Sequence, residues 1–443
     1  MFTFWQKLTS GSTNRKIFGA AVIVALGTVV VKLASLAKEL MIAWRFGTGE
    51  DLDAFLIALV VPFFLMNVIA GSFNSALIPT YIQVREQEGK EAAQRLFSGA
   101  VVWSLGLLLI TTILVVVTAP LYLPFIAQEF PPEKLDLTFR LLCWIAPVVL
   151  LSGIKTIWGA VLNAGERFAL AALSPIMTPI ITAVLLIGCW SWGVFSLAVG
   201  LVLGTALETI VLGVGLNNQG ISIRPKWYGL DTHLRQVAGQ YAPMIAGAVL
   251  MCSTNLVDQS MAAMLSGGSV AALNYGSKVI ALPLQLGATA LGTAVIPYFS
   301  RMVACQDWGK LKHTFHHYLK LIFVCTIPLT VFIVLASEPL VQVLYQRGAF
   351  TEESTAIVAQ VQASYALQIP FYISSILVVR LISSLRLNYI LMWGSGLNLM
   401  LNIVLNCLLI DWLGVSGISL STSCVYLCSF LFVTFSLKAK III

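Results

Sequence analysis

Apolar runs of about 20 residues recur from one end of this chain to the other. Each run can cross the ~30 Å hydrocarbon core of a bilayer as an α-helix, because a helix rises about 1.5 Å per residue. Hydrophobic residues make up 58% of the 443 positions and charged residues only 10%, against about 25% charged in a typical soluble domain. The sequence therefore predicts an all-α polytopic membrane protein with about twelve transmembrane helices. We place these spans at 18–42, 53–82, 97–118, 138–162, 168–190, 194–216, 240–264, 270–298, 317–344, 356–382, 388–410 and 413–437.

The polar stretch Asn217–Gln236 separates six spans from six. We predict an N-terminal six-helix bundle over 1–216, a cytoplasmic linker with an amphipathic segment over 217–239, and a C-terminal six-helix bundle over 240–443. The second and eighth spans repeat an order of proline, glycine and then Ile-Pro, which indicates internal repetition. An even number of spans in each half makes the repeats parallel, and two pseudo-symmetric bundles predict a central cavity between them.

Positive charges are distributed unevenly between the two sides of the predicted membrane. With the N-terminus inside, seventeen of the 26 Lys and Arg residues fall in cytoplasmic segments and four on the opposite side. The positive-inside rule then places both termini in the cytoplasm. The net charge of +7 is mostly this topology signal, and the lack of a basic domain outside the membrane argues against a nucleic-acid partner.

Three charges interrupt the first span, although a charge at membrane depth costs several kcal/mol. Lys32 and Glu39 are seven residues apart and lie within about 20° of each other on a helix, with Ser35 between them on the same face. Lys38 points about 100° away from Glu39. Its side chain can either snorkel to the membrane interface or line a polar passage together with Lys32 and Glu39. Asp53, at the start of the second span, is either a functional acid or an N-cap for that helix.

Polar side chains also gather in later spans. Asp258 lies in the densest polar run of the seventh span, and Asn398, Asn402 and Asn406 follow one face of the eleventh. Such asparagines either join helices by hydrogen bonds or, with the carboxylate, offer the oxygen ligands that a small hard cation prefers. Lys278 in the eighth span either snorkels or faces a cavity, where it would suit an anionic substrate.

Other chemistry-bearing residues indicate no catalytic centre. Lys155 and Glu208 fall within spans, and their positions indicate no role. No G-x-x-x-x-G-K-[ST] loop occurs, which argues against ATP as the direct energy source. No Ser/His/Asp set or paired carboxylates emerge either, so the sequence predicts a protein that is not an enzyme.

Three blocks of sequence resemble a known transporter family, the MurJ/MviN-type lipid II flippases. This family belongs to the multidrug/oligosaccharidyl-lipid/polysaccharide exporter superfamily. The blocks are FGTGEDLDAFLIALVVPFFLMNVIAGSFNSALIPTY (Phe46–Tyr81), SGGSVAALNYGSKVIALPLQLGATALGTAVIPYFS (Ser266–Ser300) and QRGAFTEES (Gln346–Ser354). The resemblance implies two six-helix bundles around a cationic cavity in the bacterial inner membrane. It also implies that the protein moves an undecaprenyl-pyrophosphate-linked saccharide, such as the peptidoglycan precursor, to the outer leaflet by alternating access.

The resemblance further implies residues for the substrate and for a coupling ion. The substrate-binding residues would be Lys32, Lys38, Glu39, Asp53 and Lys278. Some relatives bind sodium, and the matching ligands here would be Asp258, Asn398, Asn402, the Val415 carbonyl and Ser419. No other cofactor is implied. The expected partners are the lipid-linked glycan, membrane lipid, and proteins of cell-wall or polysaccharide synthesis.

Two departures from the family leave the substrate open. Met66 stands where lipid II flippases carry an arginine, and the two further C-terminal helices that many of them use for the lipid tail do not follow the twelfth span. One alternative is therefore an exporter of another lipid-linked oligosaccharide, such as an exopolysaccharide repeat unit. Two further alternatives are a cation-coupled drug exporter and a scaffold for glycan-synthesis enzymes.

Overall fold

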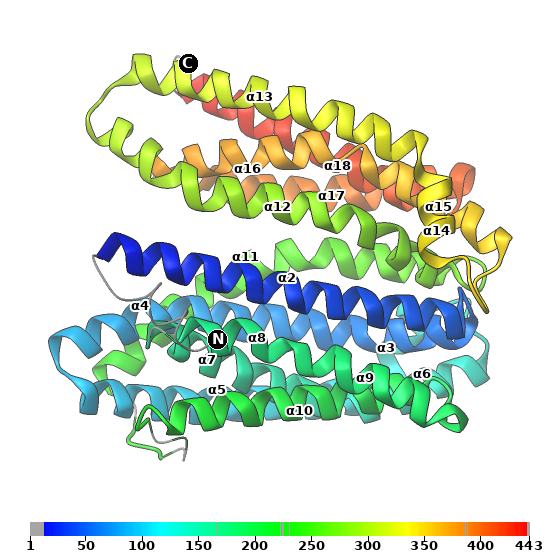
Figure 1. Cartoon of the computed structure of the whole chain (residues 1–443), viewed down its shortest axis with the longest axis horizontal. Helices are drawn as coiled ribbons and strands as arrows, with labels where there is room; N and C mark the ends of the chain where they lie inside the picture. The colour runs from blue at the N-terminus through cyan, green and yellow to red at the C-terminus, as the bar shows by residue number, and fades with distance from the viewer. Residues whose placement is uncertain are drawn as a thin grey trace. The chain divides into compact units, whose positions relative to one another are not determined.

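The computed structural model describes residues 13–165, 167–221, 223, 226–229, 231–385, 387 and 389–440, and within them every regular element is a helix (Figure 1). The predicted all-α fold class is thus confirmed. The elements up to the polar stretch are α2 (Thr13–Phe46), α3 (Glu50–Met66), the π-helix η1 (Asn67–Gly71), α4 (Ser72–Gln87), α5 (Lys90–Ile126), α6 (Pro132–Ile145), α7 (Pro147–Ala164), α8 (Phe168–Leu173), the 3₁₀ turn η2 (Ser174–Ile176), α9 (Met177–Gly188), the 3₁₀ turn η3 (Trp190–Trp192) and α10 (Phe195–Asn217). Those after it are α11 (Thr232–Ala263), α12 (Ser269–Ala304), α13 (Trp308–Leu335), α14 (Ser337–Tyr345), α15 (Glu352–Ala366), α16 (Ile369–Ser384), α17 (Tyr389–Leu413) and α18 (Val415–Lys440).

Nine helical segments among the described residues are long and apolar enough to cross a membrane. They are Glu50–Gln87, Lys90–Ile126, Pro132–Asn163, Phe168–Gly188, Phe195–Asn217, Trp308–Leu335, Glu352–Ser384, Tyr389–Leu413 and Val415–Leu437. The other three predicted spans fall in α2, α11 and α12, which are 34, 32 and 36 residues long. Both chain ends, on which the topology prediction bears, lie outside the described residues.

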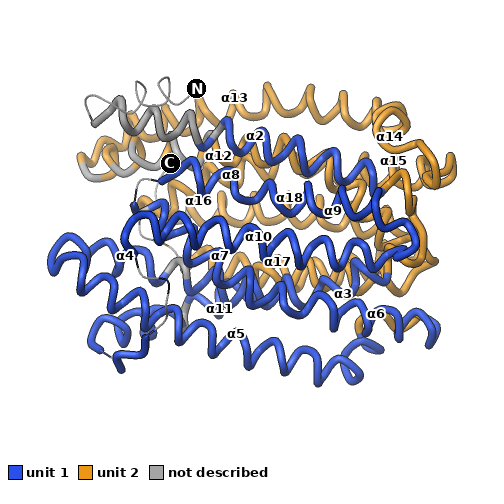
Figure 2. Tube along the Cα trace, turned by 60° about the horizontal axis from the view of Figure 1, so that its bottom comes forward, with its two compact units in different colours: residues 1–42, 54–125, 131–249 blue, residues 43–53, 126–130, 250–443 orange. Residues whose placement is uncertain are grey.

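The chain divides into two compact units, shown in different colours in Figure 2. Unit 1 comprises residues 1–42, 54–125 and 131–249, and unit 2 comprises residues 43–53, 126–130 and 250–443. Helix α11 contributes to both units, because the division falls after Val249. The segment 217–239, predicted as a linker, is grouped with unit 1.

An aromatic cluster fixes the start of α11 within unit 1. The rings of Phe73, Trp103 and Tyr241 lie 5.5–5.7 Å apart, at the distances typical of tilted and edge-to-face pairs. The Tyr241 hydroxyl donates a hydrogen bond to the carbonyl oxygen of Ile69 over 3.2 Å. Ile69 belongs to the π-helix η1, and its carbonyl also accepts a hydrogen bond from Ser72 N–H, so the tyrosine adds a second donor at an irregular turn inside a predicted span.

Glycines bring α9 and α10 into close contact. A Cβ atom at Gly204 would lie 2.5 Å from Thr178 Cα, and one at Gly200 would lie 2.8 Å from Thr182 Cα. No real Cβ tolerates such contacts with backbone. Small residues at four-residue spacing let membrane helices pack closely, where van der Waals contact replaces the hydrophobic effect as the driving force.

Side-chain caps fix where two helices of unit 2 begin. Thr351 Oγ1 accepts a hydrogen bond from Ser354 N at the start of α15, and Asp307 Oδ1 accepts one from Lys310 N at the start of α13. The Lys310 side chain also donates to Asp307, and this bond lowers the pKa of the Asp307 carboxyl. A carboxylate at this position complements the positive end of the helix dipole.

Asp53 caps a helix that is distant from it in the sequence. The residue lies in the first turn of α3 and is 1% exposed. Its carboxylate accepts hydrogen bonds from Gly268 N (2.6 Å) and Ala271 N (2.8 Å), at the start of α12. Gly268 has φ +88°, a left-handed conformation that favours glycine. Asp53 is therefore not the N-cap of its own helix, as one reading of the sequence proposed, but an anchor between α3 and α12 within unit 2.

Replacing Asp53 should destabilise unit 2. Asp53→Ala removes the acceptor for two buried N–H groups, and we expect a loss of about 3 kcal/mol, since a hydrogen bond to a charged group contributes about 1.5–3 kcal/mol. Thermal unfolding of the purified protein in detergent measures this loss. Asp51→Ala changes an exposed carboxylate two residues away and is expected to unfold like the wild type. An unchanged unfolding temperature for Asp53→Ala would contradict the capping role.

Replacing Gly204 should separate α9 from α10. We expect Gly204→Ala to lower stability by about 1–3 kcal/mol, because the added methyl group meets backbone that cannot move without opening the helix pair. Gly106→Ala in α5 is the matched control, since nothing lies within 4 Å of its added Cβ. That control should be neutral or slightly stabilising, as alanine is the better helix former. Equal unfolding temperatures for the two variants would argue against close packing at Gly204.

Candidate functional site

The charges of the first predicted span lie on α2 in an arrangement that differs from the sequence interpretation. Lys38 Nζ and Glu39 Oε1 form an ion pair of 2.8 Å, with both side chains about one-fifth exposed. The sequence places Glu39 on the same helix face as Lys32, and in the structure its carboxylate pairs with its chain neighbour Lys38, because two long side chains can bend toward each other. Lys32 is exposed on the same helix.

The two remaining predicted substrate residues lie in unit 2. Lys278 is exposed on α12, in the third turn of that helix. Asp53 is buried at the N-terminus of the same helix, where two backbone amides occupy its carboxylate oxygens. An exposed lysine can meet a charged ligand, whereas the Asp53 geometry is that of a structural cap.

Asp258 is the centre of a polar cluster inside unit 2. The residue is 7% exposed on α11. Its Oδ1 accepts hydrogen bonds from the amides of Asn402 (2.9 Å) and Asn406 (2.8 Å) on α17, and its Oδ2 accepts one from Thr422 Oγ1 (3.2 Å) on α18. The four-residue spacing of the asparagines places both on one face of α17, so three helices converge on one carboxylate.

The other predicted ion ligands make different contacts. Asn398 Nδ2 donates to Ser429 Oγ over 3.1 Å, and Ser419 Oγ donates to the Ser416 carbonyl over 2.9 Å. Val415 is buried at the start of α18. The residue that sequence reasoning missed is Thr422, which lies one helical turn beyond Ser419. The signal available in the sequence was this second hydroxyl, three residues after Ser419 and therefore on the same face of α18.

The cluster contains buried acceptor atoms that no described donor uses. The side-chain oxygens of Asn402 and Asn406 are buried and accept no hydrogen bond within the described part of the chain. Buried amide oxygens usually have partners, and each amide can turn to exchange its oxygen and nitrogen. With the amides turned, one carboxylate, two amide oxygens and one hydroxyl could face a small cation, which matches the oxygen ligands that hard cations take.

Among the residues that the structure describes, no three His, Cys, Asp or Glu side chains gather in a way that could hold a metal ion. The ion prediction therefore depends on neutral oxygen donors around a single carboxylate.

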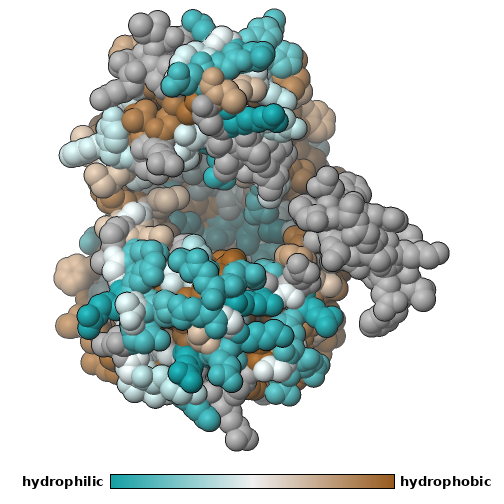
Figure 3. Space-filling model, turned by 90° about the vertical axis from the view of Figure 1, so that its left-hand side faces the viewer, coloured by the Kyte–Doolittle hydropathy of each residue, from teal (hydrophilic) through white to brown (hydrophobic). Residues whose placement is uncertain are grey.

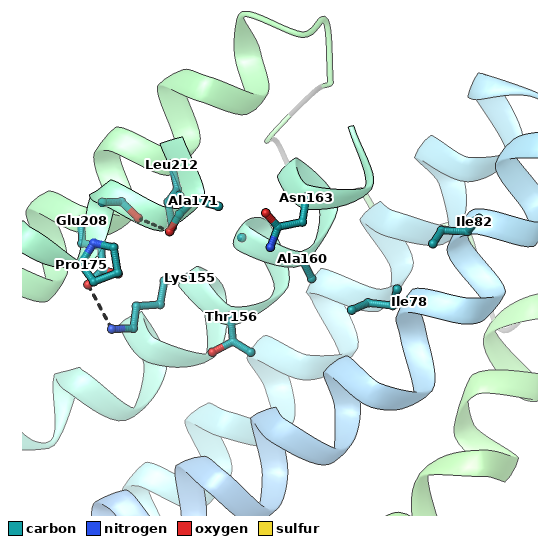
Figure 4. Close-up of a pocket in the computed structure, with 12 residues that line it drawn as sticks. Ile78, Ile82, Lys155, Thr156, Ala160, Asn163, Ala171, Pro175, Glu208 and Leu212 are labelled. Atoms are coloured by element: carbon teal, nitrogen blue, oxygen red, sulfur yellow. Dashed lines mark hydrogen bonds and ion pairs between the residues drawn. The ribbon is translucent and has the colours of Figure 1, made fainter. Parts of the chain in front are cut away.

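Unit 1 contains a second intramembrane carboxylate, for which the sequence indicated no partner. Lys155 Nζ on α7 and Glu208 Oε2 on α10 form an ion pair of 3.0 Å. The pair borders a cavity of about 530 Å³ (Figure 4). Opposite charges that each fall within a span, without other charges nearby in sequence, were the signal that could have suggested this pairing.

Comparisons with known proteins relate the whole arrangement to one family. The family model for "Lipid II flippase MurJ" matches residues 42–443. A probable lipid II flippase MurJ of Synechocystis sp. is 30% identical over 93% of this chain and 80% of its own length. One of Thermotoga maritima is 28% identical over 94% and 84%.

Solved structures show the same fold. A lipid II flippase MurJ in an inward closed conformation aligns with TM-score 0.81 at 23% identity, over 94% of this chain and 87% of that one. An inward-facing MATE family multidrug transporter of the MOP superfamily aligns with TM-score 0.74 at 13% identity, over 95% and 98%. The matches of sequence and family model span nearly the whole chain, and the chain belongs to the lipid II flippase MurJ family.

Proposed function

We propose that this protein is a flippase that moves an undecaprenyl-pyrophosphate-linked saccharide across the inner membrane, with the lipid II-type peptidoglycan precursor as first candidate. The observation that carries the proposal is the family match over residues 42–443, within which relatives are named lipid II flippases. Exposed lysines on two predicted spans, Lys32 on α2 and Lys278 on α12, support it.

The chemistry of the substrate explains why these lysines matter. A pyrophosphate carries several negative charges and loses its water shell when it enters the membrane, so cations at depth must replace the water. Lysine supplies this charge as a point ammonium without the planar fork of arginine. Such binding and release need no bond cleavage, which fits a transporter that is not an enzyme. The drug-exporter alternative is less favoured, because a site for cationic drugs should be lined by acids rather than by lysines.

A second candidate is the export of another lipid-linked oligosaccharide. Met66, in the last turn of α3, stands where the resemblance leads one to expect an arginine. An altered headgroup would be one reason for the loss of that cation. Both candidates share the polyprenyl pyrophosphate, and they differ in what is attached to it.

The proposed setting is the bacterial inner membrane with both termini in the cytoplasm. Cations at the predicted cytoplasmic ends support this orientation. Arg85 lies in the last turn of α4 and Lys90 begins α5, so both flank the α4–α5 turn of unit 1. That turn is on the side seen in Figure 3, where hydrophilic side chains gather. Proteins of cell-wall or polysaccharide synthesis are the partners to which a flippase would pass its cargo.

Sodium is the proposed coupling ion, held by Asp258, Asn402, Asn406 and Thr422. Their arrangement around one buried carboxylate supports this set. Asn398 and Ser419 make other hydrogen bonds within the described part of the chain. These two residues and Val415, the other ligands implied by the resemblance, stay predictions. Bound Na⁺ would neutralise Asp258 and join α11, α17 and α18.

Replacing the exposed lysines should slow transport. For Lys32→Ala and Lys278→Ala we expect the rate of headgroup exposure on the outer leaflet to fall about 10–100-fold, since each loses a charge-assisted contact of about 1.5–3 kcal/mol. The assay follows lipid II in vesicles containing the purified protein. Lys312→Ala changes an exposed lysine in the second turn of α13, outside the predicted span, and this control should transport normally. Full activity of both variants, or the absence of any lipid II translocation by the wild type, would refute the proposal.

Sodium should stabilise the folded protein through Asp258. Na⁺ replacing K⁺ at constant ionic strength should raise the unfolding temperature of the wild type, because a ligand that binds only the folded state adds about 2.7 kcal/mol at 100 times its Kd. Asp258→Asn should abolish this rise. Asp136→Asn is the control, because Asp136 is an exposed carboxylate of α6 that pairs with Arg140, and it should keep the response. A sodium response that survives in Asp258→Asn would exclude this site.

A further inference from the structure

The cavity beside Lys155 has two walls of different chemistry. It lies between α4, α7, α8 with η2, and α10, all in unit 1, and it is open on one side (Figure 4). Its volume of about 530 Å³ is within the range of about 300–1,000 Å³ typical of small-molecule sites. The ion pair lies on α7 and α10, where Leu212 also lines the cavity, and the α4 side opposite carries the aliphatic side chains of Ile78 and Ile82 (Figure 4).

The ion pair presents its cation to the cavity more than its anion. The Lys155 side chain is 28% exposed and that of Glu208 only 4%. Each residue lies nine positions before the end of its helix, at Ala164 and Asn217, which is about 13 Å along the axis. Both charges are thus deep within predicted spans. Polar groups at such depth are rare and usually serve a passing substrate or ion.

A break in the fifth predicted span adds a backbone acceptor to the same wall. Pro175 has no N–H, so the Ala171 carbonyl lacks its usual partner four residues later. Ser174 Oγ donates to that carbonyl over a long 3.4 Å, and all three residues line the cavity. Irregular backbone at membrane depth is tolerated where it lines a cavity or is buried in protein. This break is independent of the ion pair and occurs at the same place.

The polar wall therefore offers both hydrogen-bond donors and hydrogen-bond acceptors. Lys155 and Asn163 supply donors, and the Glu208 carboxylate, the Ala171 carbonyl and the Thr156 hydroxyl oxygen, whose hydrogen is donated to the Ser152 carbonyl, supply acceptors. A bare phosphate would use the lysine and be repelled by the glutamate. A prenyl chain would use only the aliphatic wall. The ligand that complements both charges is one that carries an ammonium and a carboxylate together, as a peptide does.

We infer that this cavity binds the peptide portion of the transported headgroup. Its ammonium would lie against Glu208 and the Ala171 carbonyl, and a carboxylate against Lys155. This inference rests on the proposed function and deepens it, because it selects a peptide-bearing precursor over a plain oligosaccharide. A lipid that stays in the leaflet would keep its headgroup at the interface, whereas a headgroup in transit passes the depth of Lys155 and Glu208.

The test compares two probes on one neutralised variant. The probes are lipid II with its stem peptide and the same polyprenyl-pyrophosphate disaccharide without the peptide, and Kd is measured for protein in nanodiscs. We expect the wild type to bind the peptide-bearing probe at least tenfold more tightly. Lys155→Met with Glu208→Gln should lose this preference and keep the wild-type Kd for the peptide-free probe. The double change leaves no unpaired buried charge, and such replacements are often neutral for stability.

Two further variants keep the test decisive. Lys155→Glu with Glu208→Lys retains an ion pair with its charges exchanged, so restored peptide preference would mean that the pair is only structural and would overturn the inference. Asn163→Leu changes an exposed cavity residue away from the pair, and should weaken the peptide preference about threefold even if the neutralised variant does not fold. Equal wild-type affinity for both probes overturns the inference alone. Failure of the wild type to bind either probe overturns the proposed function and the inference with it.

Discussion

Hydrocarbon offers no hydrogen-bonding partner, so every backbone amide and every charge inside a span of this chain must find its partner within the protein. Regular helix meets most of this demand. Side chains act at the irregular places: Tyr241 adds a second donor to the Ile69 carbonyl in the π-helix, and Asp53 supplies the acceptor for two amides at the start of α12. The Ala171 carbonyl, four residues before Pro175, accepts a long hydrogen bond from Ser174 Oγ. The first two contacts only hold helices together, whereas Ala171 lines a cavity.

The helical content follows directly from the sequence, because apolar runs of about 20 residues allow hardly any other structure in a bilayer. The breaks within spans were less predictable. Pro62 lies inside α3 without ending it, and the π-helix comes after it at Asn67–Gly71, because neighbouring helices decide whether a proline bends or ends a membrane helix. Pro175 does coincide with a break, at η2.

Contacts between side chains that are distant in the sequence could be predicted only in part. The four-residue spacing of Asn402 and Asn406 placed them on one face, and their convergence on Asp258 agrees with that interpretation. No spacing rule connects Asp53 with Gly268, or Lys155 with Glu208, because each pair joins helices whose packing depends on the whole fold. Glu39 pairs with Lys38 rather than Lys32 for a different reason. Backbone periodicity fixes where side chains start on the helix, not where their charged ends meet.

The two buried carboxylates differ in how their charge is balanced, and this difference separates their proposed ligands. Asp258 accepts hydrogen bonds from two amides and a hydroxyl, all of them neutral, so the cluster keeps one negative charge that a monovalent cation would complete. Glu208 is already balanced by Lys155, and adding a lone ion there would leave a net charge at membrane depth. A zwitterionic ligand, which carries one charge of each sign, adds no net charge there. Charge balance thus favours a cation in unit 2 and a zwitterionic peptide in unit 1.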